Sequence, residues 1–207
     1  LQKITLLNKD TTQFLMLTLN ADSLGRIISM LNIKEQAAQA QNILLTLPCS
    51  VIINYGDELQ MCGSFAKFNE PFMWNYQHID EGQTTWQKGN QNKKKKTMPL
   101  NFQLADSLSV YYETKSLLAF RNNNLFITTK FESAGFWQKN ILAYYINTEG
   151  NTFLVIHNLS NSSQQLKLEG NNYSYQKIEW QNGFGVLVAN GEISVPAYGS
   201  VVLSKKF

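Results

Sequence analysis

The chain has 207 residues, of which 43% are hydrophobic and 16% are charged, and its formal net charge is +3. This composition lies far from the highly charged, weakly hydrophobic range of disordered chains, so it favours one folded domain or two small ones. The longest apolar stretch, residues 43–53, is interrupted by Thr46, Pro48 and Ser50, and it is shorter than the roughly 18 to 20 residues that span a bilayer. We therefore expect a soluble chain with no membrane span, and no signal segment indicates a compartment.

The positive charge is unevenly distributed along the sequence. Four of the eighteen Lys and Arg residues form one run, Lys93 to Lys96, and the only arginines are Arg26 and Arg121. Surfaces that bind nucleic acids usually spread Lys and Arg over a face and use Arg to contact base edges. We interpret the lysine run as a solvated loop and expect no nucleic-acid partner.

Cysteine and histidine are scarce. Cys49 and Cys62 are the only cysteines, and His78 and His157 are the only histidines. Two cysteines do not make a disulfide framework, and four scattered soft ligands do not have the spacing of a zinc site. We therefore expect neither a bound metal nor another cofactor.

The first elements alternate between strand and helix patterns. An apolar run predicts a strand over residues 13–19, and apolar spacing predicts helices over 24–31 and 34–45. Pro48 ends the second helix, and the β-branched residues within 50–54 predict a strand that is buried on both faces. This order is a β-α-β unit, which normally joins parallel strands through a right-handed crossover.

Polar residues follow both predicted strands. Asn20-Ala21-Asp22 follows the first, and Gly56-Asp57-Glu58 follows the second. Because the chemistry of parallel α/β folds lies beyond the carboxyl ends of the strands, both groups are candidates for a functional site. For Asp57 and Glu58, a structural role in shaping the turn is the favoured interpretation. For Asp22, a helix N-terminal carboxylate is the structural alternative.

A long irregular stretch over residues 59–102 precedes a predicted helix over 103–120. In the irregular stretch, Trp74 and Trp86 are candidates for stacking on a sugar ring, although burial as anchors is the favoured interpretation. The helix has its apolar side at positions that include Leu104 and Leu108, and Asp106 or Ser107 is expected to cap it.

The sequence pattern changes after residue 122. Short strand-like runs are separated by Gly and Asn turns, which is typical of an antiparallel sandwich. The boundary lies within residues 122–136, and Trp137 and Trp180 are expected in the core. The predicted strands cover residues 125–131, 141–146, 153–159, 165–168, 176–180, 184–188, 192–195 and 200–205.

Several segments together resemble the C-terminal third of α-amylase-superfamily glycosidases, glycoside hydrolase family 13. Residues 47–58 read LPCSVIINYGDE and are similar to the family's eighth-strand pattern, Leu-Pro-Gly-x-Pro-x-Ile-Tyr-Tyr-Gly-Asp-Glu. Residues 14–22 resemble the seventh-strand motif, which ends in Asn-His-Asp. Residues 69–74 and 103–121 resemble segments of the oligo-1,6-glucosidase and maltodextrin-glucosidase branches. Matches to the family's C-terminal β-domain are residues 142–144, 154–160 and 196–203.

The resemblance implies a specific division of the chain. Residues 1–122 would be the last two β-α units of a (β/α)₈ TIM barrel, and residues 123–207 an antiparallel β-sandwich domain. The sequence begins Leu1-Gln2-Lys3-Ile4 without Met, so we expect a piece of a longer chain whose upstream barrel portion is its partner. The implied chemistry is retaining cleavage of α-glucosidic bonds in starch-derived or maltodextrin-like oligosaccharides. That chemistry needs a nucleophile and a general acid, both of which the family carries upstream of this chain.

Only the third family carboxylate has a counterpart here, which is Asp22. The resemblance implies that Asp22 stabilises the transition state and that Asn20 and Asn69 contact substrate. The chain departs from the family at Ala21, where the family has His, at Asn69, where it has Arg, and at Cys49, where it has Gly. Because a lone stabilising carboxylate cannot replace a nucleophile and a general acid, this chain alone is predicted to be inactive.

Two other functions stay open. The main alternative is a catalytically inactive homologue that serves as a binding or scaffold module, which the changes at Ala21 and Asn69 favour. A free-standing carbohydrate-binding β-module fits only the second half of the chain.

Overall fold

The structure is a computed structural model, and it describes residues 16–20, 25–31, 33–62, 71–75, 81, 98–124, 126, 130–135, 138–182 and 185–205. These residues form two compact units. We call the described residues within 18–44 and 51–118 the helical unit, and those within 16–17, 45–50 and 119–205 the β unit. The division into domains at residues 122 and 123 stays a prediction. Some predictions concern residues that lie outside the described set and so stay predictions: Ala21, Asp22, Asn69, Trp86, Trp137 and the lysine run 93–96.

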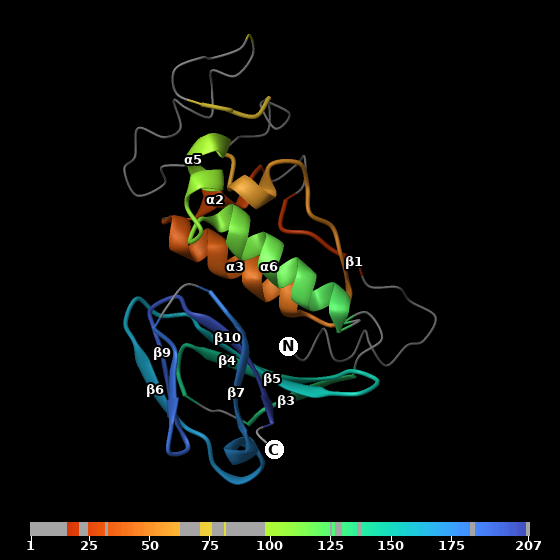
Figure 1. The fold of residues 1–207 in the computed structure, drawn as a ribbon, viewed down its shortest axis with the longest axis vertical. Helices are drawn as coiled ribbons and strands as arrows, with labels where there is room; N and C mark the ends of the chain where they lie inside the picture. The colour runs from red at the N-terminus through yellow and green to blue at the C-terminus, as the bar shows by residue number, and fades with distance from the viewer. Residues whose placement is uncertain are drawn as a thin grey trace. The chain divides into compact units, whose positions relative to one another are not determined.

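The β unit contains two antiparallel sheets (Figure 1). The larger has the order β3-β4-β5-β10-β7, and the smaller has the order β6-β9-β8. In the larger sheet the strands are β3 (Lys130–Ser133), β4 (Ile141–Asn147), β5 (Thr152–Asn158), β10 (Ser200–Lys205) and β7 (Tyr175–Gln181). In the smaller sheet they are β6 (Gln164–Lys167), β9 (Glu192–Val195) and β8 (Leu187–Ala189). A short 3-10 turn, η5 (Gly170–Ser174), precedes β7.

The two sheets enclose one apolar core. Leu154 and Ile156 of β5 and Leu203 of β10 pack with Leu166 of β6 and Ile193 of β9. This confirms the predicted antiparallel sandwich. The predicted strands also appear in order, although β3 and β8 lie a few residues later than predicted.

The strand β10, which has a neighbour on each side, is buried on both faces over most of its length. It pairs with β5 and β7, with Val202 opposite Val155 on one side and opposite Trp180 on the other. Trp180 is buried, which confirms its prediction as a core residue. Successive side chains of β10 therefore point to opposite faces of the sheet, and both faces are buried. One face packs on the core between the two sheets, and the other face belongs to a second buried layer.

A polar network occupies part of the second layer. His157 is fully buried; its Nδ1 lies 2.8 Å from Ser200 Oγ, and its Nε2 lies 3.1 Å from Thr46 Oγ1 and 3.2 Å from Tyr144 Oη. Thr46 Oγ1 and Tyr144 Oη are 2.7 Å apart. Each hydroxyl has a partner, which is the condition for burying such a network. Burial lowers the pKa of His157 to about 3, so the ring is neutral.

Arg121 fixes the C-terminal end of the helix α3 (Lys34–Thr46) and the residues that follow it. Its Nη1 donates to the carbonyls of Leu45 and Leu47, each at 2.7 Å, and its Nη2 donates to the carbonyl of Cys49. The side chain is 4% exposed, and its guanidinium lies 5.7 Å from the ring centre of Phe126. Cationic side chains at helix C-termini satisfy carbonyls that have no partner within the helix.

The helical unit is built around a long helix pair. Its elements are α2 (Ile27–Met30), α3 (Lys34–Thr46), the 3-10 turn η1 (Asp57–Leu59), α5 (Leu100–Ala105) and α6 (Val110–Asn123). α3 and α6 lie side by side (Figure 1); Gln41 Nε2 donates to Thr114 Oγ1 at 2.9 Å and Asn42 Nδ2 to Glu113 Oε1 at 2.6 Å. The α3 prediction, residues 34–45, is confirmed to within one residue.

The two predicted strands of the β-α-β unit are much shorter than expected. β1 (Met16–Leu17) and β2 (Ser50–Val51) form a two-stranded sheet, with α2 and α3 between them in sequence. The prediction that residues 50–54 are buried on both faces is wrong, because Ile52 is 41% exposed. After β2, the backbone N–H of Asn54 donates to Asp57 Oδ2 within a turn, and its side chain donates to Thr18 Oγ1, so the strand is not extended. The complete barrel stays a prediction.

The predicted helix over residues 103–120 is two helices. At the break, Asp106 Oδ1 accepts the backbone N–H of Leu108 at 2.9 Å, which draws the chain out of helical geometry. Ser109, not Asp106 or Ser107, caps α6: its Oγ accepts Tyr112 N–H at 3.5 Å and donates to Gln103 O at 2.7 Å. Because the break lies between them, Leu104 and Leu108 are exposed rather than apolar-face residues.

Ser109→Ala is expected to destabilise the helical unit by about 1–2 kcal/mol, because a cap bond and the bond to Gln103 are both lost. Ser107→Ala is the matched control, since Ser107 is exposed, and it is expected to change stability little. Urea unfolding of both variants measures the difference. Equal effects of the two substitutions would contradict the assignment of the cap.

Across the described part of the chain, no helix combines the length and apolar character that crossing a membrane requires.

Candidate functional site

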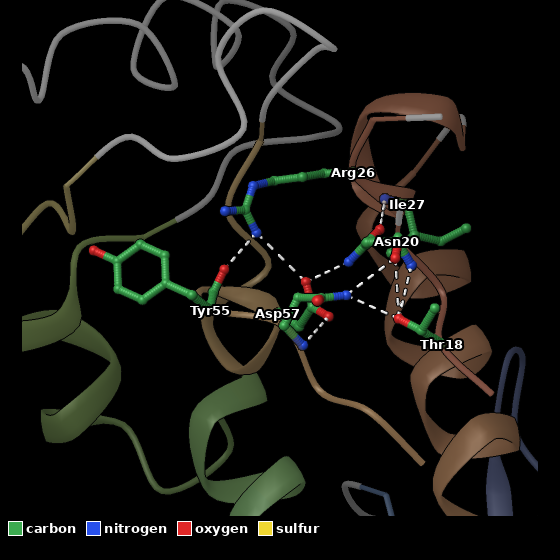
Figure 2. A network of polar contacts seen from close by, with 7 residues as sticks. Thr18, Asn20, Arg26, Ile27, Tyr55 and Asp57 are labelled. Carbon is green, nitrogen blue, oxygen red and sulfur yellow. Dashed lines mark hydrogen bonds and ion pairs between the residues drawn. The ribbon is translucent and has the colours of Figure 1, made fainter. Parts of the chain in front are cut away.

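Asn20 lies three residues after the end of β1. Both the nitrogen and the oxygen of its side-chain amide form hydrogen bonds (Figure 2). Its Nδ2 donates to Asp57 Oδ1, and its Oδ1 accepts the backbone N–H of Ile27 at 2.5 Å. Thr18 fixes the backbone of Asn20, since its Oγ1 donates to Asn20 O at 3.0 Å and accepts Asn20 N–H at 3.3 Å. Asn20 thus joins the end of β1 to the start of α2 and to the turn after β2.

The turn after β2 is closed by Asn54 and Asp57. Asp57 Oδ2 accepts the backbone N–H of Asn54 at 2.9 Å, and Asp57 N–H donates to Asn54 O at 3.0 Å. The Asn54 side chain reaches toward the other strand end, where its Nδ2 donates to Thr18 Oγ1 at 2.8 Å and to Asn20 O at 3.1 Å. Asn20, after β1, and the turn after β2 are therefore joined by hydrogen bonds.

Arg26 supplies the positive charge in this cluster. Its Nη1 lies 2.7 Å from Tyr55 O and 3.4 Å from Asp57 Oδ1, so it bonds to the backbone and the carboxylate of the same turn. The side chain is 1% exposed. A buried ion pair with these additional hydrogen bonds satisfies the charge that burial would otherwise make very costly.

Gly56 allows the Arg26 side chain to pack closely against the turn after β2. It has φ +86°, in the left-handed region that favours glycine. A Cβ at this position would lie 2.9 Å from Met61 Cγ and 3.2 Å from Arg26 Nη1. The glycine of the Tyr-Gly-Asp-Glu sequence is therefore required both by the turn and by the close packing of Arg26.

Burial dominates the electrostatics of Asp57. It raises the pKa of this carboxyl to about 6, against opposing effects of the Asn54 N–H, the Arg26 charge and the Asn20 amide. Burial also lowers the pKa of Arg26. The two bonds between Asp57 and Asn54 close the turn, which supports the interpretation that Asp57 shapes it.

The predicted site residues have different outcomes. Asp22 and Asn69 lie outside the described residues, so their roles stay predictions. Asn20 lies at the predicted strand end, but both polar atoms of its side chain bond to the protein, which favours a positioning role over direct contact with substrate. Sequence reasoning missed Arg26 and Asn54. Its only signal for Arg26 was the rarity of arginine in this chain.

An aromatic group flanks the cluster on the side of Tyr55. The Tyr55 and Phe72 rings are stacked with centres 4.3 Å apart, and the Phe72 and Trp74 rings meet edge to face at 6.0 Å. Tyr55 Oη accepts the backbone N–H of Phe72 at 2.9 Å. Trp74 is 52% exposed, so the favoured interpretation of this tryptophan as a buried anchor is wrong.

No metal centre is evident within the described ranges, since no three His, Cys, Asp or Glu side chains there are grouped to hold an ion. Cys49 and Cys62 are both buried free thiols. The chemistry available in the cluster is electrostatic positioning by Arg26 and Asp57, together with the amide bonds of Asn20 and Asn54.

Comparison with known proteins places this chain near starch-acting enzymes in sequence. Residues 141–202 match the family described as "Alpha-amylase SusG C-terminal domain". A 4-alpha-glucanotransferase from Thermotoga maritima is 30% identical over 142 residues, covering 66% of this chain and 32% of the relative. Alpha-amylase 3 from Dictyoglomus thermophilum is 31% identical over 129 residues, covering 61% of this chain and 26% of the relative. The chain spans about a third or less of the length of these relatives.

Solved structures agree in fold. An alpha-amylase from H. orenii superposes with a TM-score of 0.76 at 27% identity, over 95% of this chain and 41% of that one. An inactive double mutant of MutB in complex with isomaltulose superposes with a TM-score of 0.74 over 95% of this chain and 44% of that one. At 14% identity, the second likeness concerns the fold alone.

These findings show what the chain resembles: residues 141–202 are similar to a C-terminal domain of α-amylase-family proteins, and the fold is similar to that of an alpha-amylase. Its relatives by sequence are a 4-alpha-glucanotransferase and alpha-amylases. The predicted membership of the oligo-1,6-glucosidase branch stays a prediction.

Proposed function

We propose that this chain is the C-terminal portion of a retaining glycosidase that acts on α-glucosidic bonds of maltodextrin-like oligosaccharides. Residues 1–122 then belong to the (β/α)₈ barrel, and residues 123–207 form the β-domain that follows it. The names of its relatives, a 4-alpha-glucanotransferase and an alpha-amylase, support an α-glucan as the substrate. The resemblance of residues 69–74 and 103–121 supports the oligo-1,6-glucosidase and maltodextrin-glucosidase branches.

The observation that carries this proposal is the bond between Asn20 Oδ1 and the Ile27 N–H, at 2.5 Å. This bond joins two residues that flank the segment 21–24, which contains Asp22. A second bond, from Asn20 Nδ2 to Asp57, ties the same point to the turn after β2. The residue that directly precedes Ala21 and Asp22 is thus fixed at the strand end, where the family holds its third carboxylate.

The role proposed for Asp22 follows from the charge of the transition state. Retaining cleavage uses one carboxyl group as a nucleophile and a second as a general acid, and it passes through a sugar ring that carries developing positive charge. A fixed carboxylate stabilises that charge more than the neutral ground state. The nucleophile and the acid belong to the upstream part of the longer protein, so this chain alone is expected to show no turnover.

In the longer protein, Asp22→Asn is expected to lower kcat for an α-linked maltooligosaccharide by about a hundredfold or more, because it removes the stabilising charge. Steady-state kinetics on the purified protein measure the effect. Asp106→Asn is the matched control, since Asp106 is exposed and its bond to Leu108 N–H needs only the Oδ1 that Asn retains. If Asp22 only caps a helix, Asn replaces it with almost unchanged turnover and melting temperature. That result would overturn the proposed role.

The alternative function is a catalytically inactive homologue that serves as a binding or scaffold module. Ala21 and Asn69 favour it, because each replaces a residue that donates hydrogen bonds to sugar in the family. Ala21→His in the longer protein distinguishes the two. An increase in turnover supports the enzyme, whereas absence of turnover in both the natural protein and the variant supports the binding module.

A further inference from the structure

A hollow of about 730 Å³ opens on the β unit. Ligand sites in proteins typically have volumes of roughly 300–1,000 Å³. Five parts of the chain contribute to it: the end of α6, the turn between β4 and β5, and the strands β5, β7 and β10. The lining residues are Phe120, Asn124, Thr148, Glu149, Gly150, Asn151, Thr152, Phe153, Lys177, Glu179, Ser204 and Lys205.

The apolar side of the hollow is rigidly packed. The Phe120 ring meets Phe153 at 5.3 Å and Phe126 at 5.6 Å, in both cases edge to face. Phe153 is buried, whereas Phe120 is only half-buried and also lines the hollow. An aromatic ring held by two others presents a fixed apolar surface to a ligand.

Another part of the lining is the turn that joins β4 and β5, which projects from the sheet as a hairpin (Figure 1). Thr148 closes this turn, because its N–H and its Oγ1 both donate to Asn151 O, at 2.8 and 3.0 Å. The turn therefore has a defined backbone conformation. It presents the side chains of Thr148 and Asn151 as hydroxyl and amide groups along the hollow.

The charges in the hollow balance. Lys177 Nζ lies 2.8 Å from Glu179 Oε1, and Ser204 Oγ donates to the same oxygen at 2.6 Å. Lys205 Nζ lies 5.6 Å from the ring centre of Tyr175, and Glu149 supplies a second carboxylate. Two cations and two anions therefore line the hollow, which disfavours a phosphorylated or otherwise highly charged ligand.

We propose that this hollow binds a short neutral oligosaccharide through the β unit, independently of the Asn20–Asp57 cluster. Amides, hydroxyls and paired charges beside one fixed aromatic ring complement a sugar, which carries many hydroxyl groups around an apolar C–H face. A lipid would leave these polar groups unsatisfied. A second hollow of about 460 Å³ shares Thr152 and Lys205 with the first, so the polar surface extends beyond one sugar unit. The choice of an α-glucan among sugars rests on the proposed function.

The test is a titration of the 207-residue chain with maltoheptaose, followed by amide NMR shifts. Saturable shifts within residues 148–153 and at Ser204 and Lys205 are expected. Absence of saturable binding at millimolar sugar, or shifts confined to residues 18–118, would overturn the proposal. Tighter binding of inorganic phosphate at the same amides would also overturn it, because the hollow would then select charge. The titration measures binding and not turnover. A negative result therefore refutes this binding site without refuting the proposed activity, and the reverse also holds.

Gly150→Trp is the blocking variant. A Cβ at Gly150 meets no atom within 4 Å, so the turn tolerates a side chain there, and the added indole stands at a residue that lines the hollow. We expect maltoheptaose affinity to fall about tenfold or more, with an unchanged melting temperature. Lys167→Trp, at an exposed position of β6 outside the hollow, is the matched control and should bind as the natural chain does. Equal affinity of the two variants would refute the site.

Discussion

Asp57→Ala is expected to destabilise the helical unit by about 3–5 kcal/mol at neutral pH, because it leaves the buried Arg26 without its carboxylate partner. The loss extends beyond the ion pair. The Asn20 amide and the Asn54 backbone N–H also donate to this carboxylate, and both lose their acceptor. One substitution therefore breaks the connection between the two strand ends. Hydrogen exchange of peptides from α3 and α6 measures the effect in the helical unit.

Asp57→Asn is the informative companion variant. It keeps the shape and one acceptor, so it is expected to cost much less than Asp57→Ala. The pKa of Asp57 is raised from its ordinary 3.8 to about 6, so the pH-dependent part of its contribution to stability is fully present below about 3.8 and is lost as the pH rises through about 6, whereas its contacts with Arg26, Asn20 and Asn54 remain. The stability advantage of the natural chain over Asp57→Asn should then shrink between about pH 4 and pH 7. Equal costs of the two substitutions, or an advantage that grows over this range, would contradict the assigned network.

The helices and strands were predictable where one signal dominated. The Ala- and Gln-rich segment of α3 and the alternating strands of the β unit have the required periodicity and lie within a few residues of their predicted positions. The break between α5 and α6 was not predictable from periodicity. It depends on which of Asp106, Ser107 and Ser109 captures a backbone N–H, and all three are competent caps.

The polar cluster was predictable as a meeting of strand ends but not in its chemistry. Asn20 and Asp57 follow their strands at positions that topology brings together. Nothing in the sequence indicated that Arg26 and Arg121 would be buried in polar contacts. The rarity of arginine in this chain was used only as an argument against nucleic-acid binding. Both are buried and bind backbone carbonyls, at Tyr55 O and at Leu45 O for example. Carbonyls are common to every residue, so the sequence does not reveal which of them an arginine will bind.

Acidification is expected to destabilise the β unit through His157. Burial lowers the pKa of this ring from 6.5 to about 3, so its neutral state contributes stability above about pH 6.5 that is lost as the pH falls toward 3. Each pKa unit corresponds to about 1.4 kcal/mol, so the full effect is several kcal/mol. The physical cause is the complete burial of the ring, which disfavours the charged imidazolium, and its described partners, Ser200, Thr46 and Tyr144, are all hydroxyls.

His157→Gln tests this cause, because glutamine retains a donor and an acceptor but does not titrate. The variant is expected to be less stable than the natural chain at about pH 7 and to lose much less stability on acidification. Both proteins are best compared in the Asp57→Asn background, since Asp57 has the opposite pH dependence. Hydrogen exchange of peptides from β5 and β10, at about pH 7 and about pH 4.5, reads the β unit separately. If the natural chain and His157→Gln lose protection equally on acidification, then another group causes the acid sensitivity, because a residue that does not titrate contributes no pH dependence of its own.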